Sequence, residues 1–300
     1  MRKLKKAELP RGHYFAEFML FVVTFLWSST FVFVKWAIDP HIWIGKSFTP
    51  NLLITYRFTI ASFLFILWKP SFLKDFIQKN VFWGVFLGAL LYIAYLSQTF
   101  GLKYTTASKG AFITALALVF VPFLSISIER QLPKVNSIIG CFIALVGLYL
   151  LLNPFATKTS INVGDFLCLI CSIMWGLYIV ILSKVSKDES KINSLIFSQF
   201  FTITILCWIY LIFSGEKLFV PELKLSGLIL YLGIFCTFFT TFLQTTFQRR
   251  TNSIRAALIF TTEPLIVTGL AFIMMGETLS TPQIIGGLLI VWGVIFSEIF

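Results

Sequence analysis

The sequence predicts an all-α integral membrane protein: ten transmembrane helices, arranged as two inverted five-helix repeats with both termini in the cytoplasm. Hydrophobic residues make up 58% of the 300 residues and charged residues only 12%, with a mean hydropathy of +0.90. Soluble domains are about 45–50% apolar and about 25% charged. The apolar residues fall into ten long blocks, and the second half of the chain repeats the pattern of the first.

Each apolar block is long enough to cross a membrane as a helix, because about 20 residues cover a hydrocarbon core of ~30 Å. Strands of a membrane barrel would instead alternate in polarity over ~10 residues. The expected spans are 15–37, 51–68, 80–102, 105–128, 135–152, 163–183, 192–213, 225–247, 254–275 and 281–299. Residues 1–14 form a basic cytoplasmic segment. The apolar run after them is too long for a signal peptide and lacks a small-x-small cleavage site, so we expect a retained first span.

The second half of the chain copies the first at a shift of 146 to 148 residues. The matched residues include Ala111 with Ala257, Thr114 with Thr261, Trp27 with Trp175, Gln98 with Gln244, and Gly147 with Gly293. We therefore expect two units, residues 15–152 and 163–300. Each unit holds five spans, an odd number, so the second unit enters the membrane from the opposite side and lies inverted.

Lys and Arg near span ends favour the cytoplasmic side, which predicts the orientation. Sixteen of the 24 basic residues lie in the N-terminal segment and on its side of the membrane, seven lie on the other side, and Arg57 lies within a span. Both termini are therefore expected in the cytoplasm. This asymmetry accounts for the net charge of +11, so we expect no nucleic-acid partner.

Three stretches carry a family resemblance: GLKYTTASKGAFITALALVFVPFL at 101–124, Glu263-Pro264, and GETLSTPQIIGGLLIVWGV at 276–294. Together with the five-plus-five layout, they resemble the drug/metabolite transporter superfamily, EamA type. The resemblance implies transport of small organic molecules such as amino acids, sugars, purines or drugs, often outward. It also implies a central cavity lined by helices one to four and six to nine. The first repeat has Leu116-Ala117 where the second has Glu263-Pro264, so that carboxylate is not duplicated.

Inverted repeats are typical of secondary transporters that alternate access to a midplane site. We therefore predict a secondary active exporter of small organic metabolites, such as amino acids or drugs, in the bacterial inner membrane. The sequence contains no GxxxxGK[ST] motif for binding ATP. A passive channel or facilitator is the alternative, since some channels also have inverted repeats. An intramembrane enzyme is disfavoured because HExxH and GxSxG motifs are absent and both His13 and His41 lie outside the spans.

Ionisable residues deep in a span are costly and mark functional sites or buried pairs. Glu263 lies about ten residues, or ~15 Å, into its span, and Pro264 is expected to kink the helix there. Glu263 either contacts a cationic substrate group and takes part in proton coupling, or is a protonated or paired structural residue. Arg57 lies six residues past Asn51, ~9 Å deep. Arg57 either binds a substrate carboxylate, pairs with a neighbouring helix, or extends its charged group to the outer surface.

Lys109 and Arg255 begin matched spans on opposite sides of the membrane. They are expected either at the entrances of the cavity, as gates, or as interfacial anchors, and Lys35 is expected as an anchor. Polar and aromatic residues inside the spans complete the predicted cavity: Trp27, Thr30, Tyr95, Gln98, Thr114, Trp175, Tyr178 and Thr241. The alternative use of each is hydrogen bonding between helices.

No metal or cofactor is expected. The five cysteines lie inside apolar blocks, and the CxxC of Cys168 and Cys171 has no neighbouring His or carboxylate partner set. Glycines recur seven residues apart in the fifth and tenth spans, which places each pair on one helix face. These faces serve either packing within the monomer or a homodimer through helices five and ten.

Overall fold

The computed structural model describes residues 12–39, 48–69, 81–130, 132–152, 161–188, 192–216, 218, 222–275 and 280–299, and within these ranges it contains helices and no strand. The first half of the chain forms α1 (Gly12–Ile38), α3 (Pro50–Trp68), α5 (Val81–Tyr104), α6 (Ala107–Ala115), α7 (Ala117–Glu129) and α8 (Val135–Leu152). The second half forms α9 (Val163–Val185), α10 (Ile192–Ser214), α11 (Leu223–Gly233), η3 (Ile234–Phe239), α12 (Thr240–Phe247), η4 (Gln248–Arg250), α13 (Ser253–Phe260), α14 (Glu263–Met275) and α15 (Thr281–Ile299).

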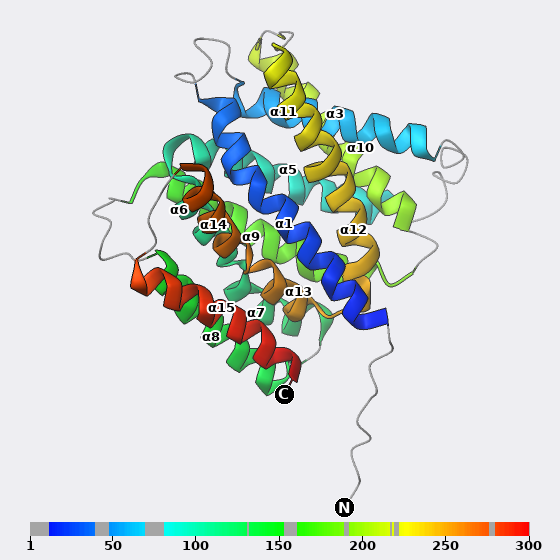
Figure 1. Ribbon diagram of the computed structural model, residues 1–300. Coiled ribbons are helices and arrows are strands. Elements are labelled where there is room, and N and C mark those ends of the chain that lie inside the picture. The colour runs from blue at the N-terminus through cyan, green and yellow to red at the C-terminus, as the bar shows by residue number, and fades with distance from the viewer. Residues whose placement is uncertain are drawn as a thin grey trace, which may run out of the picture.

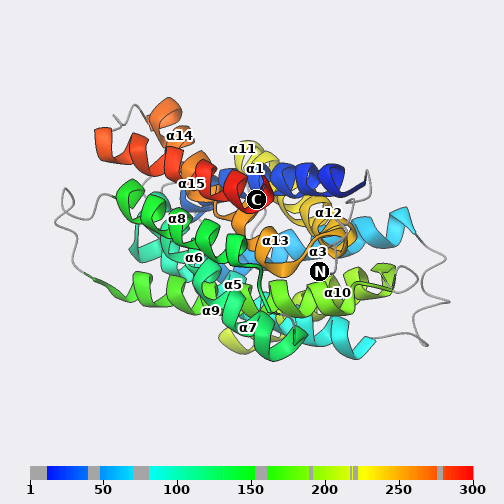
Figure 2. The same cartoon turned by 90° about the horizontal axis from the view of Figure 1, so that it is seen from below.

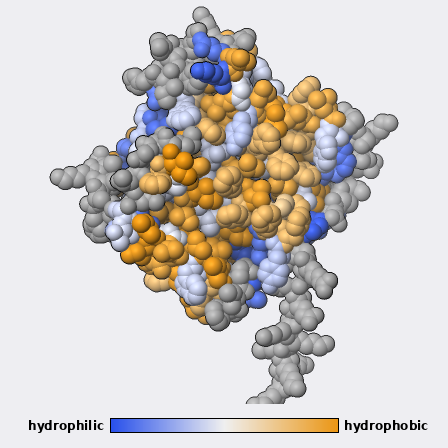
Figure 3. Space-filling model, viewed as in Figure 1, coloured by the Kyte–Doolittle hydropathy of each residue, from blue (hydrophilic) through white to orange (hydrophobic). Residues whose placement is uncertain are grey.

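Every segment predicted as a span is mostly helical where the chain is described. Among the described residues, eight helical segments are long and apolar enough to cross a membrane, and α8 and α15 are shorter apolar helices. Apolar side chains also cover the outside: orange residues spread across the middle of the face in Figure 3, and blue residues gather near its margins. Large exposed side chains such as Phe18 (58%) and Phe142 (68%) would be unfavourable in water. The chain is a multi-pass integral membrane protein.

Polar residues just before the helices determine where several of them begin. Thr49 accepts a hydrogen bond from the Leu52 amide (3.2 Å) ahead of Pro50, the first residue of α3. Asn162 and Asp165 form a reciprocal capping box at the start of α9. Such caps satisfy amides that have no partner within the helix, which is essential at a membrane boundary.

Two spans are interrupted near their middle. The span that starts at Ala107 breaks at Leu116, between α6 and α7, and the span that starts at Ser253 breaks at Thr261 and Thr262, between α13 and α14. The second break immediately precedes Glu263-Pro264, which confirms the predicted kink. The first break was not predicted, since no proline adjoins it.

The span of residues 223–250 contains a π-helical segment, η3, between α11 and α12. There the Thr237 hydroxyl donates to the Leu232 carbonyl (2.7 Å), five residues earlier. This wider turn was not foreseen from the sequence, because π-helical segments have no distinctive apolar period.

The helices pack so that matched elements of the two halves meet. α8 lies along α15 at one edge of the molecule (Figures 1 and 2), while α1 runs across the face seen in Figure 1. The first helix of each half contacts the fourth span of the other half: α9 packs on α6 and α7, and α1 packs on α13 and α14. The interrupted spans are thereby held against α1 and α9 in the interior.

The glycine faces of α8 and α15 pack against each other. A Cβ atom on Gly147 would lie 2.6 Å from the Gly286 carbonyl oxygen, and one on Gly140 would lie 2.6 Å from that of Gly293. The close contact therefore requires glycine at these positions. Because these faces are used within the chain, a homodimer through α8 and α15 would have to use their other faces.

Candidate functional site

Both halves of the chain contribute to a cavity in the described part of the structure. It encloses about 570 Å³ of non-atom space, including the space at its mouth. Seven of the sequence-predicted residues line it: Trp27, Thr30, Tyr95, Gln98, Thr114, Trp175 and Glu263. The remaining lining residues were not among those predicted to line the cavity, although Ala257 and Thr261 were matched to Ala111 and Thr114 by the repeat: Phe31, Ala115, Ala117, Leu118, Ile179, Ala257, Phe260 and Thr261.

Aromatic rings form much of the cavity wall. The rings of Trp27 and Trp175 are 5.0 Å apart between centroids, Phe260 lies 5.4 Å from Trp27, and Tyr95 lies 5.8 Å from Trp175. Trp27 Nε1 is buried and has no hydrogen-bond partner in the described part of the chain. Such walls suit an organic solute with an apolar body, and ring faces also attract cations.

The polar run around Trp27 satisfies most of its own hydrogen bonds. Thr24 donates to the Leu20 carbonyl (2.9 Å), and Ser28 donates to the Thr24 carbonyl (2.8 Å). Hydroxyl groups that bond to the carbonyl four residues earlier are tolerated inside an apolar helix. The run is therefore compatible with a continuous helix α1 in the membrane interior.

Glu263 supplies the carboxylate among the residues that line the cavity. It is the first residue of α14 and is 8% exposed, and its backbone carbonyl accepts a hydrogen bond from Ser28 (3.3 Å). Within the described residues, no side chain hydrogen-bonds or ion-pairs with its carboxyl group. A helix N-terminus favours negative charge, so the break before Glu263 places this group where a carboxylate is tolerated.

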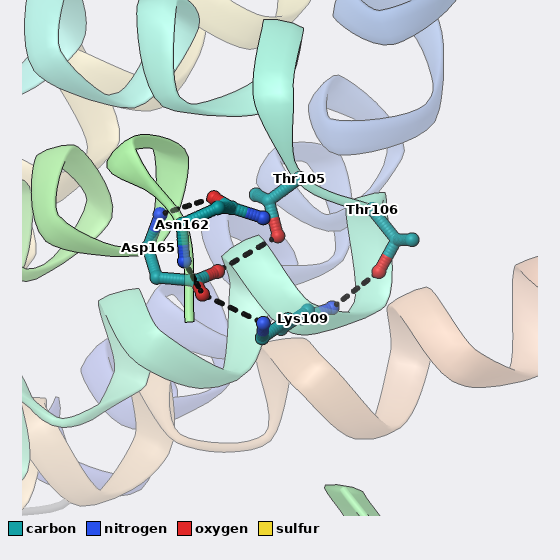
Figure 4. A network of polar contacts seen from close by, with 5 residues as sticks. All are labelled: Thr105, Thr106, Lys109, Asn162 and Asp165. Carbon is teal, nitrogen blue, oxygen red and sulfur yellow. Dashed lines mark hydrogen bonds and ion pairs between the residues drawn. The ribbon is translucent and has the colours of Figure 1, made fainter. Parts of the chain in front are cut away.

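Ion pairs connect the two halves on either side of this cavity. Lys109 on α6 pairs with Asp165 on α9 at 2.6 Å, and Arg255 on α13 pairs with Glu17 on α1 at 3.6 Å. The Thr105 hydroxyl also donates to Asp165 (3.0 Å), as Figure 4 shows. The two acidic partners were not predicted from the sequence.

Comparison with known proteins adds the family. The sequence model of the EamA-like transporter family matches twice, over residues 14–153 and 162–298. The chain belongs to the EamA-like transporter family. This family is part of the drug/metabolite transporter superfamily, so the resemblance of residues 101–124 and 276–294 is confirmed.

Relatives of this EamA-like chain carry transporter names. An Archaeoglobus fulgidus protein named "Uncharacterized transporter" is 31% identical over 285 residues, which cover 95% of this chain and 86% of the relative. The Bacillus subtilis protein "Uncharacterized transporter YyaM" is 21% identical, over 84% of this chain and 85% of the relative. A solved crystal structure matches with a TM-score of 0.75 at 17% identity, covering 94% of this chain and 96% of the other, which shows the shared fold.

Three residues predicted to line the cavity of this EamA-like protein lie outside it: Arg57, Tyr178 and Thr241. Arg57 is 1% exposed; its Nε donates to the Thr237 hydroxyl (3.1 Å), and its Cζ lies 5.3 Å from the Tyr95 ring centroid. The guanidinium therefore sits behind the ring that forms the cavity wall. Tyr178 donates to Gln199 (2.8 Å), and its ring lies 5.3 Å from that of Trp175.

The second, seventh and eighth spans contribute no residue to the cavity wall, contrary to what the family resemblance implied. Aromatic packing explains part of this difference, because Phe58 of α3 fills the space between Tyr95 (5.1 Å) and Phe200 of α10 (6.3 Å). The eighth span also departs from the repeat. Gln98 faces the cavity, whereas its match Gln244 donates to Gln248 (2.9 Å) in a buried network.

Lys35 and the cysteines of the CxxC sequence are not part of the cavity wall. Lys35 donates to the carbonyls of Leu102 (3.0 Å) and Thr105 (2.5 Å), which ties the end of α1 to the end of α5. Cys168 and Cys171 are buried free thiols, and no group of three potential metal ligands occurs among the described residues.

Proposed function

We propose that this EamA-like protein is a secondary active exporter of small organic metabolites or drugs that carry a positive charge on an apolar or aromatic body. The observation that supports this most is the composition of the cavity wall: the rings of Trp27, Tyr95, Trp175 and Phe260 line the same cavity as Glu263. Amines of amino acids and cationic drugs combine both features. Aromatic faces and a carboxylate are the groups that recognise such cations.

The proposed layout has ten spans, with the second five inverted relative to the first and both termini in the cytoplasm. The supporting observations are the two breaks at matched positions, the exchange of first and fourth spans between the halves, and the double match of the family model. Discontinuous helices at the midplane are typical of transporters that alternate access around a fixed site.

Proton coupling through Glu263 completes the proposal. If the carboxylate can bind either a proton or the substrate cation, but not both, release of one accompanies binding of the other. In a bacterial inner membrane with an inward proton gradient, this exchange would drive cations outward. Glu263 suits the role because it lies in the cavity wall without a competing cation among the described residues.

The test is ligand binding to the purified protein, measured as thermal stabilisation across amino acids, cationic drugs, sugars and nucleobases. We expect organic cations to stabilise the protein, and Glu263→Gln to weaken their binding by at least tenfold, since a charge-assisted hydrogen bond contributes about 1.5–3 kcal/mol. The matched control is Glu129→Gln, because the Glu129 carboxylate is held outside the cavity by the hydroxyls of Ser125 (2.7 Å) and Ser253 (2.8 Å). Equal binding of cations and their neutral analogues would contradict the proposal.

The alternative of a passive channel is separated from a carrier by counterflow. In proteoliposomes, unlabelled substrate on the far side accelerates uptake of labelled substrate through a carrier, because the loaded cavity returns faster than the empty one. A channel shows no such acceleration, so its absence would favour the channel.

A further inference from the structure

The four residues of the two ion pairs occupy matched positions in the two halves of the chain. Lys109 and Arg255 are 146 residues apart, and Glu17 and Asp165 are 148 residues apart, the same shifts that relate the rest of the repeat. Each pair joins the first helix of one half to the fourth span of the other. The two contacts are thus one arrangement built twice.

The surroundings of the two cations match as well. The amide of Lys109 donates to the Thr106 side chain (3.2 Å) at the start of α6, and the amide of Arg255 donates to the Asn252 side chain (2.8 Å) at the start of α13. Each cation therefore occupies the third position of a capped helix. Its helix then runs directly into the cavity wall, at Thr114 in α6 and at Ala257 in α13.

The two pairs lie at opposite ends of α1. Glu17 is near its start, whereas Lys35 near its end donates to the Thr105 carbonyl, and the Thr105 hydroxyl in turn contacts Asp165. Eighteen residues separate Glu17 from Lys35, which is ~27 Å along a helix. Trp27 and Thr30 line the cavity between these ends, so the cavity has one ion pair on each side.

The side chains of both pairs are largely shielded, with 15% and 8% exposed for Lys109 and Asp165, and 6% and 12% for Arg255 and Glu17. A shielded pair is stable only while both partners are together. If the cavity opens beside an ion pair and water enters, hydration of the two charged groups offsets the loss of their mutual attraction. A charged contact can therefore open and close reversibly. An apolar seal would instead expose its surface to water at every opening.

Asp165 is the fixed partner of its pair (Figure 4). Its carboxylate accepts hydrogen bonds from Thr105 (3.0 Å) and from the Asn162 amide (3.0 Å) in addition to Lys109. An Asp165→Asn change keeps a carbonyl oxygen for the Asn162 amide, lets the new NH2 group donate to the Thr105 hydroxyl, and removes the charge. It is therefore a selective way to weaken the pair.

We propose that Lys109 with Asp165 forms the outer gate and Arg255 with Glu17 forms the inner gate of the transport cycle, and that the two open alternately. Both ion pairs are formed in this structure. The assignment of outer and inner sides rests on the proposed function and its orientation. The pairing and its symmetry rest on the contacts themselves.

The test measures access to the cavity from each side. A cysteine is placed at Ala115, a small residue of the cavity wall, and is labelled in intact cells with a membrane-impermeant thiol reagent. We expect Asp165→Asn to raise the rate of labelling from outside at least fivefold, and Glu17→Gln to lower it by a similar factor. Inverted membrane vesicles should give the opposite pattern. Lys109→Met should act as Asp165→Asn does, and the double variant should add little to either single one.

The outcomes separate gating from a general structural role. If the substitutions only loosen the fold, the labelling rate from outside should change in the same direction for Asp165→Asn and Glu17→Gln, and that result would overturn the proposal. Labelling rates within twofold of the parent, or no labelling in any variant, would also overturn it. Size-exclusion profiles of the variants serve as the control for folding. Because no substrate is needed, opposite shifts would support the gates even if organic cations fail to bind.

Discussion

The indole rings of Trp27 and Trp175 lie 5.0 Å apart at an interplanar angle of 55°, although 148 residues separate them in the chain. They occupy equivalent positions in the first helix of each half, and both line the cavity. Contact between matched residues is expected where a symmetry axis passes between two repeats. The cavity therefore lies where the two copies of the unit meet.

Replacing Trp175 should weaken the binding of organic cations. We expect Trp175→Leu to reduce affinity by about 2- to 30-fold, because a cation–ring contact contributes about 0.5–2 kcal/mol and leucine is apolar but smaller and has no ring face. Titration calorimetry on the purified protein measures the change. The control is Trp292→Leu on α15, whose ring is 51% exposed on the outer surface. An equal loss in both variants would remove Trp175 from the ligand site.

Replacing Glu263 should separate driven transport from exchange. We expect Glu263→Gln to abolish uptake or efflux driven by a pH gradient in proteoliposomes, because glutamine cannot exchange a proton for the substrate. Exchange of labelled for unlabelled substrate should persist at saturating concentration, since the aromatic walls remain. Gradient-driven transport that is unchanged in the variant would exclude Glu263 from coupling.

The Arg57 guanidinium should depend on Thr237 for its stability in the interior. Thr237→Val leaves the buried Nε without its acceptor, and a stranded donor costs about 1–3 kcal/mol of the free energy of unfolding. Adding Arg57→Met should recover part of this loss, because donor and acceptor are then both absent. Thermal unfolding in detergent compares the variants. The control Thr204→Val removes the bond to Ser62 (2.9 Å), which involves no charge. A double variant no more stable than Thr237→Val would contradict this account.

The contact of α8 with α15 should tolerate no side chain at its glycines. Gly147→Ala would place a Cβ 2.6 Å from the Gly286 carbonyl oxygen, and such overpacking costs about 1–3 kcal/mol. Gly269→Ala is the matched control, since its Cβ would meet no atom within 4 Å. Thermal stability of the monomer should fall for the first variant alone. If Gly147→Ala and Gly269→Ala unfold at similar temperatures, the close contact between α8 and α15 does not contribute to stability.

Much of the site follows from the sequence because the repeat compares two copies within one chain. Trp27 and Trp175 are equivalent in the two repeats and lie in the middle of their spans, whereas tryptophans are more common at the membrane interface. Both line the cavity. Arg57 was also conspicuous but lies behind Tyr95. Burial cost marks a residue as unusual in a span, but it does not fix the direction in which the side chain points.

The acidic partners of Lys109 and Arg255 were detectable in the sequence, but they were not predicted from it. Glu17 and Asp165 share the shift of 148 residues, so a search for matched charges of opposite sign could have found them. Their pairing with the cations could not be read in the same way. It depends on the exchange of first and fourth spans between the halves, which is a tertiary contact.

Composition and the lengths of the apolar blocks by themselves determined that the chain is a helical membrane protein, because an isolated apolar helix satisfies its backbone in lipid. The internal repeat determined which residues correspond. Only the tertiary structure decided that the breaks at Leu116 and Thr261 meet α1 and α9 in the interior, and which polar side chains face the cavity. Helix rotation and neighbour choice depend on the packing of the whole bundle, and a local pattern of nearly uniform hydrophobicity carries little information about either.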